Sequence, residues 1–218
     1  METNEIKRTA DGSHTLSSGQ FHETYHSSFG AIQESRHIFI GAGLHRIKEM
    51  KEPIEILEIG FGTGLNALLS FLWAEENSKV IDYTGIEAFP VAENLVDKLN
   101  YPELLSCNQR LFKLIHQRGI QSLSKYFQSQ VIPVSFQDFV PEKNTCHLIF
   151  FDAFSPETQP EMWTNEGFLK LYAALKPTGI LVTYSSKGIV KRALKEAGFS
   201  IEKIPGPPGK REFLRATK

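Results

Sequence analysis

One segment constrains the fold of this chain more than any other: Glu58-Ile59-Gly60-Phe61-Gly62-Thr63-Gly64-Leu65-Asn66. An apolar run precedes it at residues 54–57, and a helical pattern follows at residues 67–73. The pattern predicts a buried strand, a glycine-rich turn and a helix, an arrangement that brings bare backbone N–H groups and a helix N-terminus against a ligand. Close packing of the helix on the strand is the alternative reason for glycines in such a turn.

The glycine spacing and the acidic residue before it indicate which ligand the turn binds. The order is G-x-G-x-G, not the G-x-G-x-x-G of dinucleotide folds, and the Gly-Lys-Ser/Thr of a P-loop is missing. A carboxylate at this position disfavours a phosphate and favours a ligand that carries an amino group and a sulfonium. We therefore predict a site for S-adenosylmethionine that includes Glu58, Gly60, Gly62, Gly64 and Asn66.

Length and composition predict one large domain, or a domain with a small appendage, because 218 residues with 41% apolar side chains can bury a substantial core. No apolar run is long enough to cross a membrane, and the polar, acidic first five residues predict no secretory signal. Cys107 and Cys146 lie far apart, and the seven histidines lack acidic partners at metal-ligand spacing. We expect a cytoplasmic protein with no metal site and no membrane contact.

Basic residues are concentrated in the C-terminal part. Residues 170–218 hold eleven Lys/Arg and three Asp/Glu, a balance of +8, whereas residues 1–169 hold 13 basic and 22 acidic residues, a balance of −9. Such asymmetry is typical of a surface that binds a polyanion, and equally of a tail whose lysines are only solvated.

Apolar segments alternate with amphipathic ones after residue 53. Strands are expected at residues 54–59, 80–88, 131–136, 147–151, 180–185, 199–204 and 212–216, and helices at residues 65–76, 90–99, 102–117, 162–175 and 188–197. This order predicts an α/β, Rossmann-like fold with a mostly parallel seven-stranded sheet and helices on both faces. Residues 11–29 are polar without a clear period and residues 31–50 have a helical pattern. We expect residues 1–50 to cap a domain of residues 51–218.

Ligands of open parallel sheets bind beyond the carboxyl ends of the strands, where further polar residues are found. Glu87 ends the second strand and can accept both hydroxyls of a ribose, unless it is a surface residue before a helix. Asp138 follows the third strand and can accept from an adenine amino group while Phe139 covers the ring. A helix or turn cap is the alternative role for Asp138.

Asp152 follows the fourth strand, in the run Phe150-Phe151-Asp152-Ala153-Phe154-Ser155-Pro156. A carboxylate at this point faces the group that is transferred. Its apolar neighbours desolvate it and so raise its basicity. Asp152 is therefore a candidate base or an anchor for an amine, and capping of the following turn is the structural alternative.

Motifs along nearly the whole chain, in order, resemble one family. They are Asp11-Gly12-Ser13-His14-Thr15-Leu16, Glu23-Thr24-Tyr25-His26-Ser27, Glu34-Ser35-Arg36-His37-Ile38-Phe39-Ile40, the glycine turn, the Asp152 run, Pro160-Glu161-Met162-Trp163-Thr164 and Gly209-Lys210-Arg211-Glu212. The chain resembles the methyltransferase domain of the bacterial bifunctional enzyme that completes 5-methylaminomethyl-2-thiouridine at the tRNA wobble position, a domain that also exists free-standing. Many methyltransferases share the glycine turn, whereas the Asp152 run joined to the last two motifs is more specific.

The resemblance implies a class I methyltransferase fold, S-adenosylmethionine as donor, and transfer to the exocyclic amine of 5-aminomethyl(-2-thio)uridine in tRNA. It adds Tyr25 and Glu34 to the expected cofactor-binding residues. The bifunctional relatives carry a flavin-dependent oxidase domain that first removes a carboxymethyl group. This chain ends at Lys218 without such a domain. We therefore expect that it binds no FAD and needs aminomethyl-uridine from another pathway.

The expected chemistry assigns roles to the remaining residues. An aminomethyl group, by analogy with lysine at a pKa of about 10.4, is protonated at neutral pH and has no lone pair for attack. Asp152 is expected to bind this ammonium, take or relay its proton, and aim the nitrogen at the methyl group. The uridine must leave its stack, and Tyr25, Phe154 and Trp163 are the aromatic candidates to receive it. The phosphates of the anticodon arm are expected to contact Lys187, Lys191, Arg192, Lys210 and Arg211.

Three other functions remain open at this stage. A small-amine alkyltransferase of the spermidine-synthase type shares the sheet, a glycine turn and an Asp at the fourth strand, although the basic C-terminal part disfavours a polyamine substrate. A non-catalytic RNA-binding module with the same fold is disfavoured by intact Glu58, Glu87 and Asp152. A dinucleotide oxidoreductase is disfavoured by the glycine spacing. The oligomeric state is not indicated.

Overall fold

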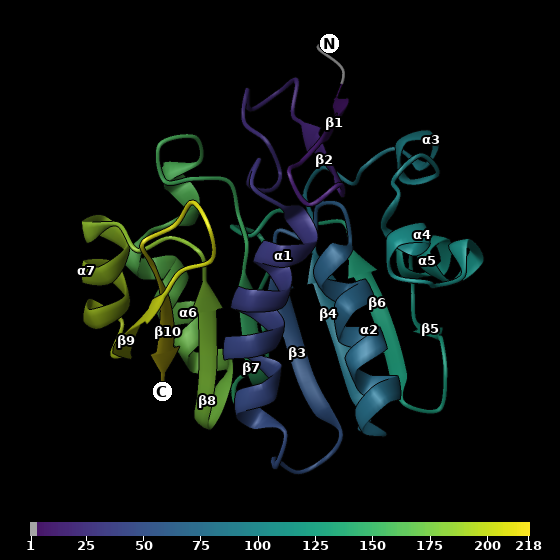
Figure 1. Ribbon diagram of the computed structural model, residues 1–218. Coiled ribbons are helices and arrows are strands. Elements are labelled where there is room, and N and C mark those ends of the chain that lie inside the picture. Colours follow the sequence, from purple (N-terminus) through teal and green to yellow (C-terminus); the bar gives the residue numbers. More distant parts are fainter. Residues whose placement is uncertain (1–3) are drawn as a thin grey trace.

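A computed structural model describes residues 4–218, so the first three residues of the expected cap lie outside the described residues. Its centre is a sheet of eight strands in the order β5-β6-β4-β3-β7-β8-β10-β9 (Figure 1). The strands are β3 (Ile54–Ile59), β4 (Ile81–Ile86), β5 (Gln121–Ser122), β6 (Phe127–Ile132), β7 (Cys146–Phe151), β8 (Leu175–Thr183), β9 (Ser200–Pro205) and β10 (Glu212–Thr217). The run from β6 to β8 is parallel, and β10, β9 and β5 pair antiparallel.

Each of the seven expected strands is present, and the eighth, β5, is a two-residue strand at the sheet edge that the sequence pattern missed. All six residues of β7 are buried, as are five of the six in β3. Parallel strands that are covered on both faces have such continuous apolar runs. The central position of β3 and β7 brings the glycine turn next to the residues that follow β7.

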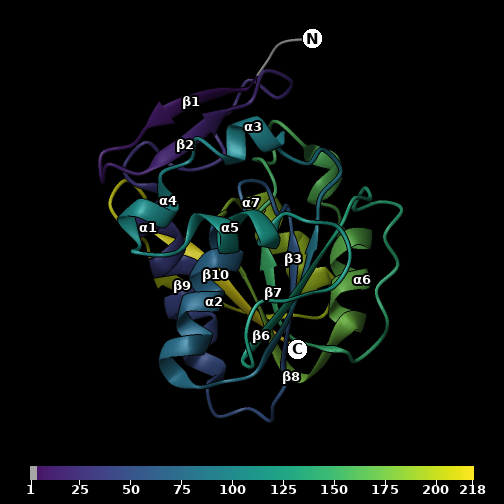
Figure 2. The same cartoon turned by 90° about the vertical axis from the view of Figure 1, so that its right-hand side faces the viewer.

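Helices cover both faces of the sheet (Figure 2). They are α1 (Ala31–Ser35), continued by a π-helical turn, η1 (Arg36–Gly41), and α2 (Leu65–Asn77), α3 (Glu93–Val96), α4 (Tyr101–Leu104), α5 (Gln109–Ile115), α6 (Asn165–Ala174) and α7 (Gly188–Glu196), with short 3-10 turns η2 (Leu44–Ile47) and η3 (Pro160–Met162). The layer of α1, η1 and α2 packs on one face, and α6 with α7 packs on the other. Within residues 4–218, no helix combines the length and the apolar character that spanning a bilayer requires.

Several expected boundaries are wrong. The helix expected over residues 102–117 is split into α4 and α5, and Ser106 between them takes a positive φ of 52°. The helix expected at residues 90–99 is reduced to the single turn α3. The strand expected at residues 131–136 instead spans Phe127–Ile132, because it pairs with β4 residue by residue and ends where β4 ends. Strand ends depend on the partner strand, which local periodicity does not contain.

The N-terminal segment contains a hairpin of β1 (Glu5–Arg8) and β2 (His14–Ser17), which lies over the carboxyl ends of the parallel strands (Figure 1). The polar sequence of residues 11–29 did not predict it. Asn100 anchors the hairpin, since its Oδ1 accepts the His14 N–H at 2.8 Å and its Nδ2 donates to Gly12 O at 3.0 Å. Because α1 and η1 pack against α2, and η1 also contacts β8, a boundary at residue 50 stays a prediction.

Candidate active site

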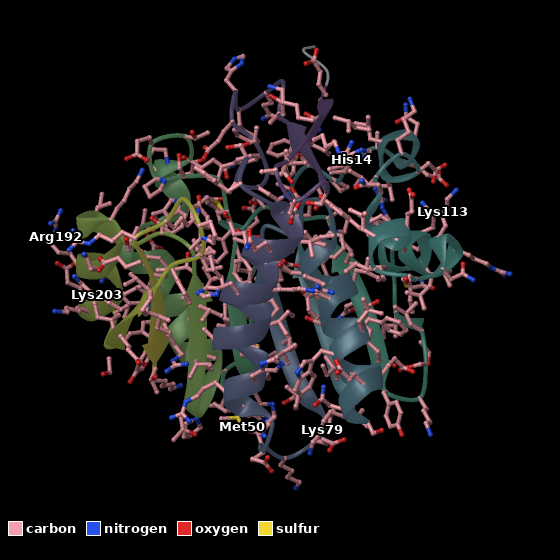
Figure 3. All side chains as sticks on the ribbon, viewed as in Figure 1. His14, Met50, Lys79, Lys113, Arg192 and Lys203 are labelled. Atoms are coloured by element: carbon pink, nitrogen blue, oxygen red, sulfur yellow. The ribbon has the colours of Figure 1, made fainter. Side chains whose placement is uncertain are left out.

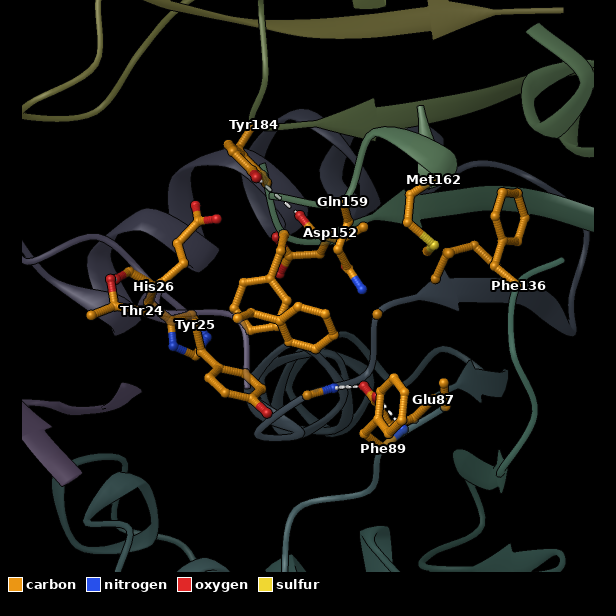
Figure 4. Close-up of a pocket in the computed structure, with 18 of the residues that line it drawn as sticks. Thr24, Tyr25, His26, Glu87, Phe89, Phe136, Asp152, Gln159, Met162 and Tyr184 are labelled. Atoms are coloured by element: carbon orange, nitrogen blue, oxygen red, sulfur yellow. Dashed lines mark hydrogen bonds between the residues drawn. The ribbon is translucent and has the colours of Figure 1, made fainter. Parts of the chain in front are cut away.

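A cavity of about 500 Å³ opens at the carboxyl ends of the parallel strands, beside the segment that joins β2 to α1 (Figure 4). The sheet topology explains its position, since β3, β4, β6, β7 and β8 all end at this edge. The lining residues discussed below are Phe21, Glu23, Tyr25, His26, Glu34, Gly60, Gly62, Glu87, Phe89, Ser135, Phe136, Gln137, Asp152, Phe154, Glu161, Tyr184 and Lys210.

The glycine turn forms the floor of the cavity, and none of its three glycines has room for a side chain. Gly60 has φ +87°, and a Cβ there would lie 2.6 Å from the Asp152 carbonyl oxygen. Gly62 has φ +51°, and a Cβ there would lie 2.9 Å from the Tyr25 ring. Gly64 is the N-cap of α2, where a Cβ would lie 2.7 Å from His116 Nε2, and it does not line the cavity. Close packing and an exposed backbone face therefore occur in the same turn.

Glu87 fixes the turn from the end of β4. Its Oε2 accepts the Gly62 N–H at 2.8 Å, and its Oε1 accepts the Phe89 N–H at 2.9 Å (Figure 4). Burial raises the pKa of this carboxyl group, while the two backbone donors lower it. Each carboxylate oxygen can accept more than one hydrogen bond, so Glu87 keeps acceptor capacity toward the cavity that it lines.

A buried hydrogen-bond network supports Asp152 from behind. Asn66 Nδ2 donates to Glu58 Oε1 at 2.8 Å and to Asp152 Oδ2 at 2.9 Å. Tyr83 donates its hydroxyl to the other Glu58 oxygen at 2.7 Å. Glu58 is 0% exposed and Asn66 is 2% exposed, and neither lines the cavity. The predicted direct contact of these two residues with the cofactor is therefore not supported, because the turn folds over them and points both side chains inward.

Asp152 reaches the cavity from the end of β7 (Figure 4). Burial raises its pKa to about 7, and the nearby Glu34 adds to this rise, while the Asn66 hydrogen bond and the charge of Lys210 oppose it. A carboxyl group with a pKa near neutrality can both hold and release a proton under cellular conditions. This property agrees with the predicted role of a base, which stays a prediction.

The charge of the cavity wall indicates what kind of ligand fits. Five carboxyl groups line it, whereas Lys210 is its one lysine or arginine among the described residues. His26 is neutral at physiological pH, because burial lowers its pKa to about 4. The carboxyl groups are those of Glu23, Glu34, Glu87, Asp152 and Glu161. Such a wall disfavours polyphosphates and favours a ligand with a sulfonium and an amino group. Together with the glycine floor and Glu87, it fits S-adenosylmethionine.

Aromatic rings gather at the same cavity. The ring centroid of Phe154 lies 4.9 Å from those of Phe21 and Tyr25, and the Phe21 ring lies 5.8 Å from Phe89. Phe21 and Phe89 were missed, although Phe89 follows Glu87 directly in the sequence. Trp163 is a correction, since its side chain is 2% exposed and its indole N–H donates to Phe154 O at 2.8 Å. Trp163 thus supports Phe154 and does not itself face the cavity.

Similarity to known proteins shows the family to which the chain belongs. A family model described as S-adenosyl-L-methionine-dependent methyltransferase matches residues 107–218, which is more than half of the chain. The chain belongs to this methyltransferase family. The predicted resemblance to the methyltransferase domain of the bifunctional enzyme is confirmed, as is the class I methyltransferase fold.

Two bacterial relatives carry the name tRNA 5-methylaminomethyl-2-thiouridine biosynthesis bifunctional protein MnmC. This chain is 29% identical over 216 residues to the relative from Pseudomonas savastanoi pv. phaseolicola. It is 28% identical over 225 residues to the relative from Aliivibrio fischeri. Each alignment covers 92% of this chain and 33% of the relative. The chain therefore spans about a third of the length of these relatives.

Two solved structures are similar over almost the whole methyltransferase. MNMC2 from Aquifex aeolicus has a TM-score of 0.80 at 27% identity and covers 99% of this chain and 70% of its own. Spermidine synthase from Thermotoga maritima has a TM-score of 0.59 at 15% identity, and the match covers 98% of this chain and 68% of the spermidine synthase chain. At this lower identity the second likeness shows the fold alone.

Two residues expected at the cofactor lie elsewhere in the methyltransferase. Because β6 ends at Ile132, the residues that reach the cavity after it are Ser135, Phe136 and Gln137, which sequence reasoning missed. Asp138 accepts from Ser135 Oγ at 2.7 Å and donates its N–H to the same oxygen at 3.1 Å, which is the turn role that was the alternative. Phe139 lines a separate hollow. Neither residue lines the cavity, so the expected contact of Asp138 and Phe139 with the adenine is not supported.

The expected phosphate-binding residues are divided between two locations. Lys187 is exposed and pairs with Glu157, and Lys191 lies 3.4 Å from Glu212. Arg192 points outward from α7 (Figure 3), and Arg211 is exposed. Lys210 differs from these four, because its side chain is turned into the cavity. An external phosphate role for Lys210 is therefore not supported.

Proposed function

We propose that this methyltransferase transfers the methyl group of S-adenosylmethionine to the exocyclic amine of 5-aminomethyl(-2-thio)uridine at the wobble position of tRNA, in the cytoplasm. The observation that carries the proposal is Asp152, a desolvated carboxyl group beside the glycine floor of an acidic cavity. The names of the bacterial relatives and the likeness to MNMC2 support the same acceptor.

The donor is held by the floor of the cavity. The backbone at Gly60 and Gly62 lies against it, Glu87 accepts from the ribose hydroxyls, and residues 134–137 contact the adenine. When bound, S-adenosylmethionine supplies a methyl group on a positively charged sulfur. The carboxylates of the wall favour this charge, as they favour the amino group of the methionine part.

Asp152 prepares the acceptor. It binds the aminomethyl ammonium and takes one proton, which leaves a nitrogen lone pair. In the displacement a nitrogen–carbon bond forms, the carbon–sulfur bond breaks, and the proton stays on the carboxyl group. With an amine pKa of about 10.4 and an Asp152 pKa of about 7, proton transfer is unfavourable by roughly 5 kcal/mol. Alignment of the two reactants and a lowered amine pKa must supply the difference.

The tRNA contacts the rim of the cavity. A uridine that leaves its stack meets the aromatic group of Phe21, Tyr25, Phe89 and Phe154. Lys187, Arg192 and Arg211 are exposed cations on the same C-terminal part of the chain, where they are available to phosphates of the anticodon arm. These contacts give affinity, and the cavity chemistry selects the acceptor.

The test is a comparison of acceptors. The protein is incubated with S-adenosylmethionine and either tRNA that carries 5-aminomethyl-2-thiouridine or putrescine, and products are identified by mass spectrometry of nucleosides and amines. We expect methylaminomethyl-2-thiouridine only. Asp152→Asn should abolish its formation and retain donor binding, whereas Asp97→Asn, which changes an exposed aspartate, should behave as the native protein. Modification of putrescine in place of tRNA would favour the small-amine alkyltransferase.

A further inference from the structure

The ammonium group of Lys210 faces the cavity, and the proposed reaction does not use it. It belongs to residues 206–211, the turn between β9 and β10, which is closed by hydrogen bonds from Gly206 N–H to Arg211 O at 3.1 Å and from Lys210 N–H to Pro207 O at 2.9 Å. Gly209 packs so closely on Phe29 that a Cβ would lie 2.2 Å from its ring. The turn is therefore held in place, and it aims Lys210 into the cavity.

The surroundings of this ammonium group are those of an ammonium-binding position. Lys210 Nζ lies 3.5 Å from Glu34 Oε1 and 4.4 Å from the centre of the Tyr184 ring. The Glu34 side chain is 10% exposed, and its second oxygen, Oε2, has no hydrogen-bond partner among the described residues. A carboxylate and an aromatic face are the two groups by which proteins bind alkylammonium ions. Lys210 thus occupies a site that another ammonium ion could fill.

This position adjoins Asp152. Tyr184 donates its hydroxyl to the carbonyl oxygen of Ala153, the residue after Asp152, at 2.9 Å (Figure 4). The charges of Glu34 and Lys210 both act on the Asp152 carboxyl group, Glu34 raising its pKa and Lys210 lowering it. Glu34 and Asp152 are therefore two carboxyl groups of the same cavity on which the charge of Lys210 acts.

We propose that Lys210 fills a second ammonium position beside Asp152, so that the cavity accepts a substrate with a single ammonium group and rejects diamines. The inference rests on the proposed function in one respect, that Asp152 is the partner of the acceptor amine. It deepens that function by assigning a specificity-determining residue, and it separates this cavity from one that takes a polyamine.

The electrostatic reason concerns proton transfer as much as selectivity. Two uncompensated carboxylates would bind an ammonium ion firmly and raise its pKa, which prevents the amine from becoming a nucleophile. Lys210 neutralises Glu34, and its positive charge near the acceptor lowers the amine pKa, as a neighbouring cation does for reactive lysines. Tyr184 and His26, which also lie near Lys210, are neutral and do not oppose this effect.

The test removes the resident ammonium and supplies another. Calorimetry measures the binding of n-butylammonium and of putrescine to the full chain loaded with S-adenosylhomocysteine, for the native protein, Lys210→Ala and Lys203→Ala. Lys203 is the matched control, because it is an exposed lysine on the same β9–β10 hairpin. We expect Lys210→Ala to bind both amines at least tenfold more tightly than the other two, and Glu34→Gln added to Lys210→Ala to cancel this gain.

Equal amine binding by Lys210→Ala and Lys203→Ala, or a gain that survives Glu34→Gln, would overturn the inference. If Lys210→Ala does not fold, acetylation of the native protein gives a second measurement. Lys210 should be modified at least tenfold more slowly than Lys203, and comparable rates would count against the proposal. These measurements do not need methyl transfer, so an inactive native protein would refute the proposed function and leave this result standing. With active protein, n-butylammonium should also restore turnover to Lys210→Ala.

Discussion

The side-chain amide nitrogen of Asn66 lies 2.9 Å from Oδ2 of Asp152, and its other proton is donated to Glu58. One amide thus separates two buried carboxyl groups and sets the direction of the one that reaches the cavity. Both amide protons are used in this way, whereas the amide oxygen, Oδ1, has no hydrogen-bond partner among the described residues. Asn66 is therefore a positioning residue in the proposed mechanism, and the expectations below start from it.

Replacing Asn66 by Asp should be strongly destabilising. It places a third carboxyl group between Glu58 and Asp152 in a site that is 2% exposed, and we expect a loss of about 3 kcal/mol in the free energy of unfolding. Asn66→Ala should cost less in stability but should lower turnover at least tenfold, because Asp152 loses its orientation. Denaturant titration and single-turnover kinetics measure the two effects. Native turnover in Asn66→Ala would remove the positioning role.

The pKa of Asp152 predicts a dependence of stability on pH. Folding raises this pKa from 3.8 to about 7, so the folded state holds the proton more tightly, and the contribution to stability falls as pH rises from about 4 to 7. Asp152→Asn lacks this titration. The free energy of unfolding of the native protein, relative to Asp152→Asn, should therefore decrease by about 2–3 kcal/mol between pH 5 and pH 8. Asp97→Asn, measured in parallel, should show no such difference from the native protein.

The close approach at Gly62 can be separated from its backbone conformation. Gly62→Ala must accommodate a Cβ 2.9 Å from the Tyr25 ring at φ +51°, whereas Gly119→Ala has φ +78° with nothing within 4 Å. Both should lose about 1 kcal/mol of stability from the left-handed conformation. Only Gly62→Ala should also weaken binding of S-adenosylmethionine, by roughly tenfold or more. Calorimetry measures the affinity of both variants for S-adenosylmethionine. If the two affinities are equal, the turn tolerates a side chain at position 62.

Glu87 is expected to control donor affinity. Glu87→Gln keeps one acceptor oxygen for the backbone N–H groups of Gly62 and Phe89, but it replaces the other by a donor. The dissociation constant for S-adenosylmethionine should rise about 10- to 100-fold, as expected for one lost charged hydrogen bond. Glu93→Gln, at an exposed position on α3, is the control. An affinity for the donor in Glu87→Gln equal to that of the control would exclude the ribose role.

Sequence patterns alone predicted the strand-turn-helix at the glycines, the seven main strands and the position of Asp152 at the end of the fourth of them. These follow from local rules, because apolar runs and glycine spacing report directly on backbone conformation. Local rules failed at the edges of elements, where the pairing with β4 ends β6 at Ile132, so that residues 134–137 line the cavity and Asp138 does not. They also missed the β1–β2 hairpin, whose anchor, Asn100, lies more than 80 residues away.

What the sequence by itself determined is the family, the fold and the position of Glu87 and Asp152 at the carboxyl ends of two strands. Only the tertiary structure decided which side chains face the cavity. Glu58 and Trp163 proved to be supports behind the wall, while Phe21 and Lys210 proved to be part of it. The physical reason is that the direction of a side chain depends on packing between elements distant in the chain. From its basic segment alone, Lys210 is expected to lie on the surface. The fold instead brings Glu34 and Tyr184 next to its ammonium group.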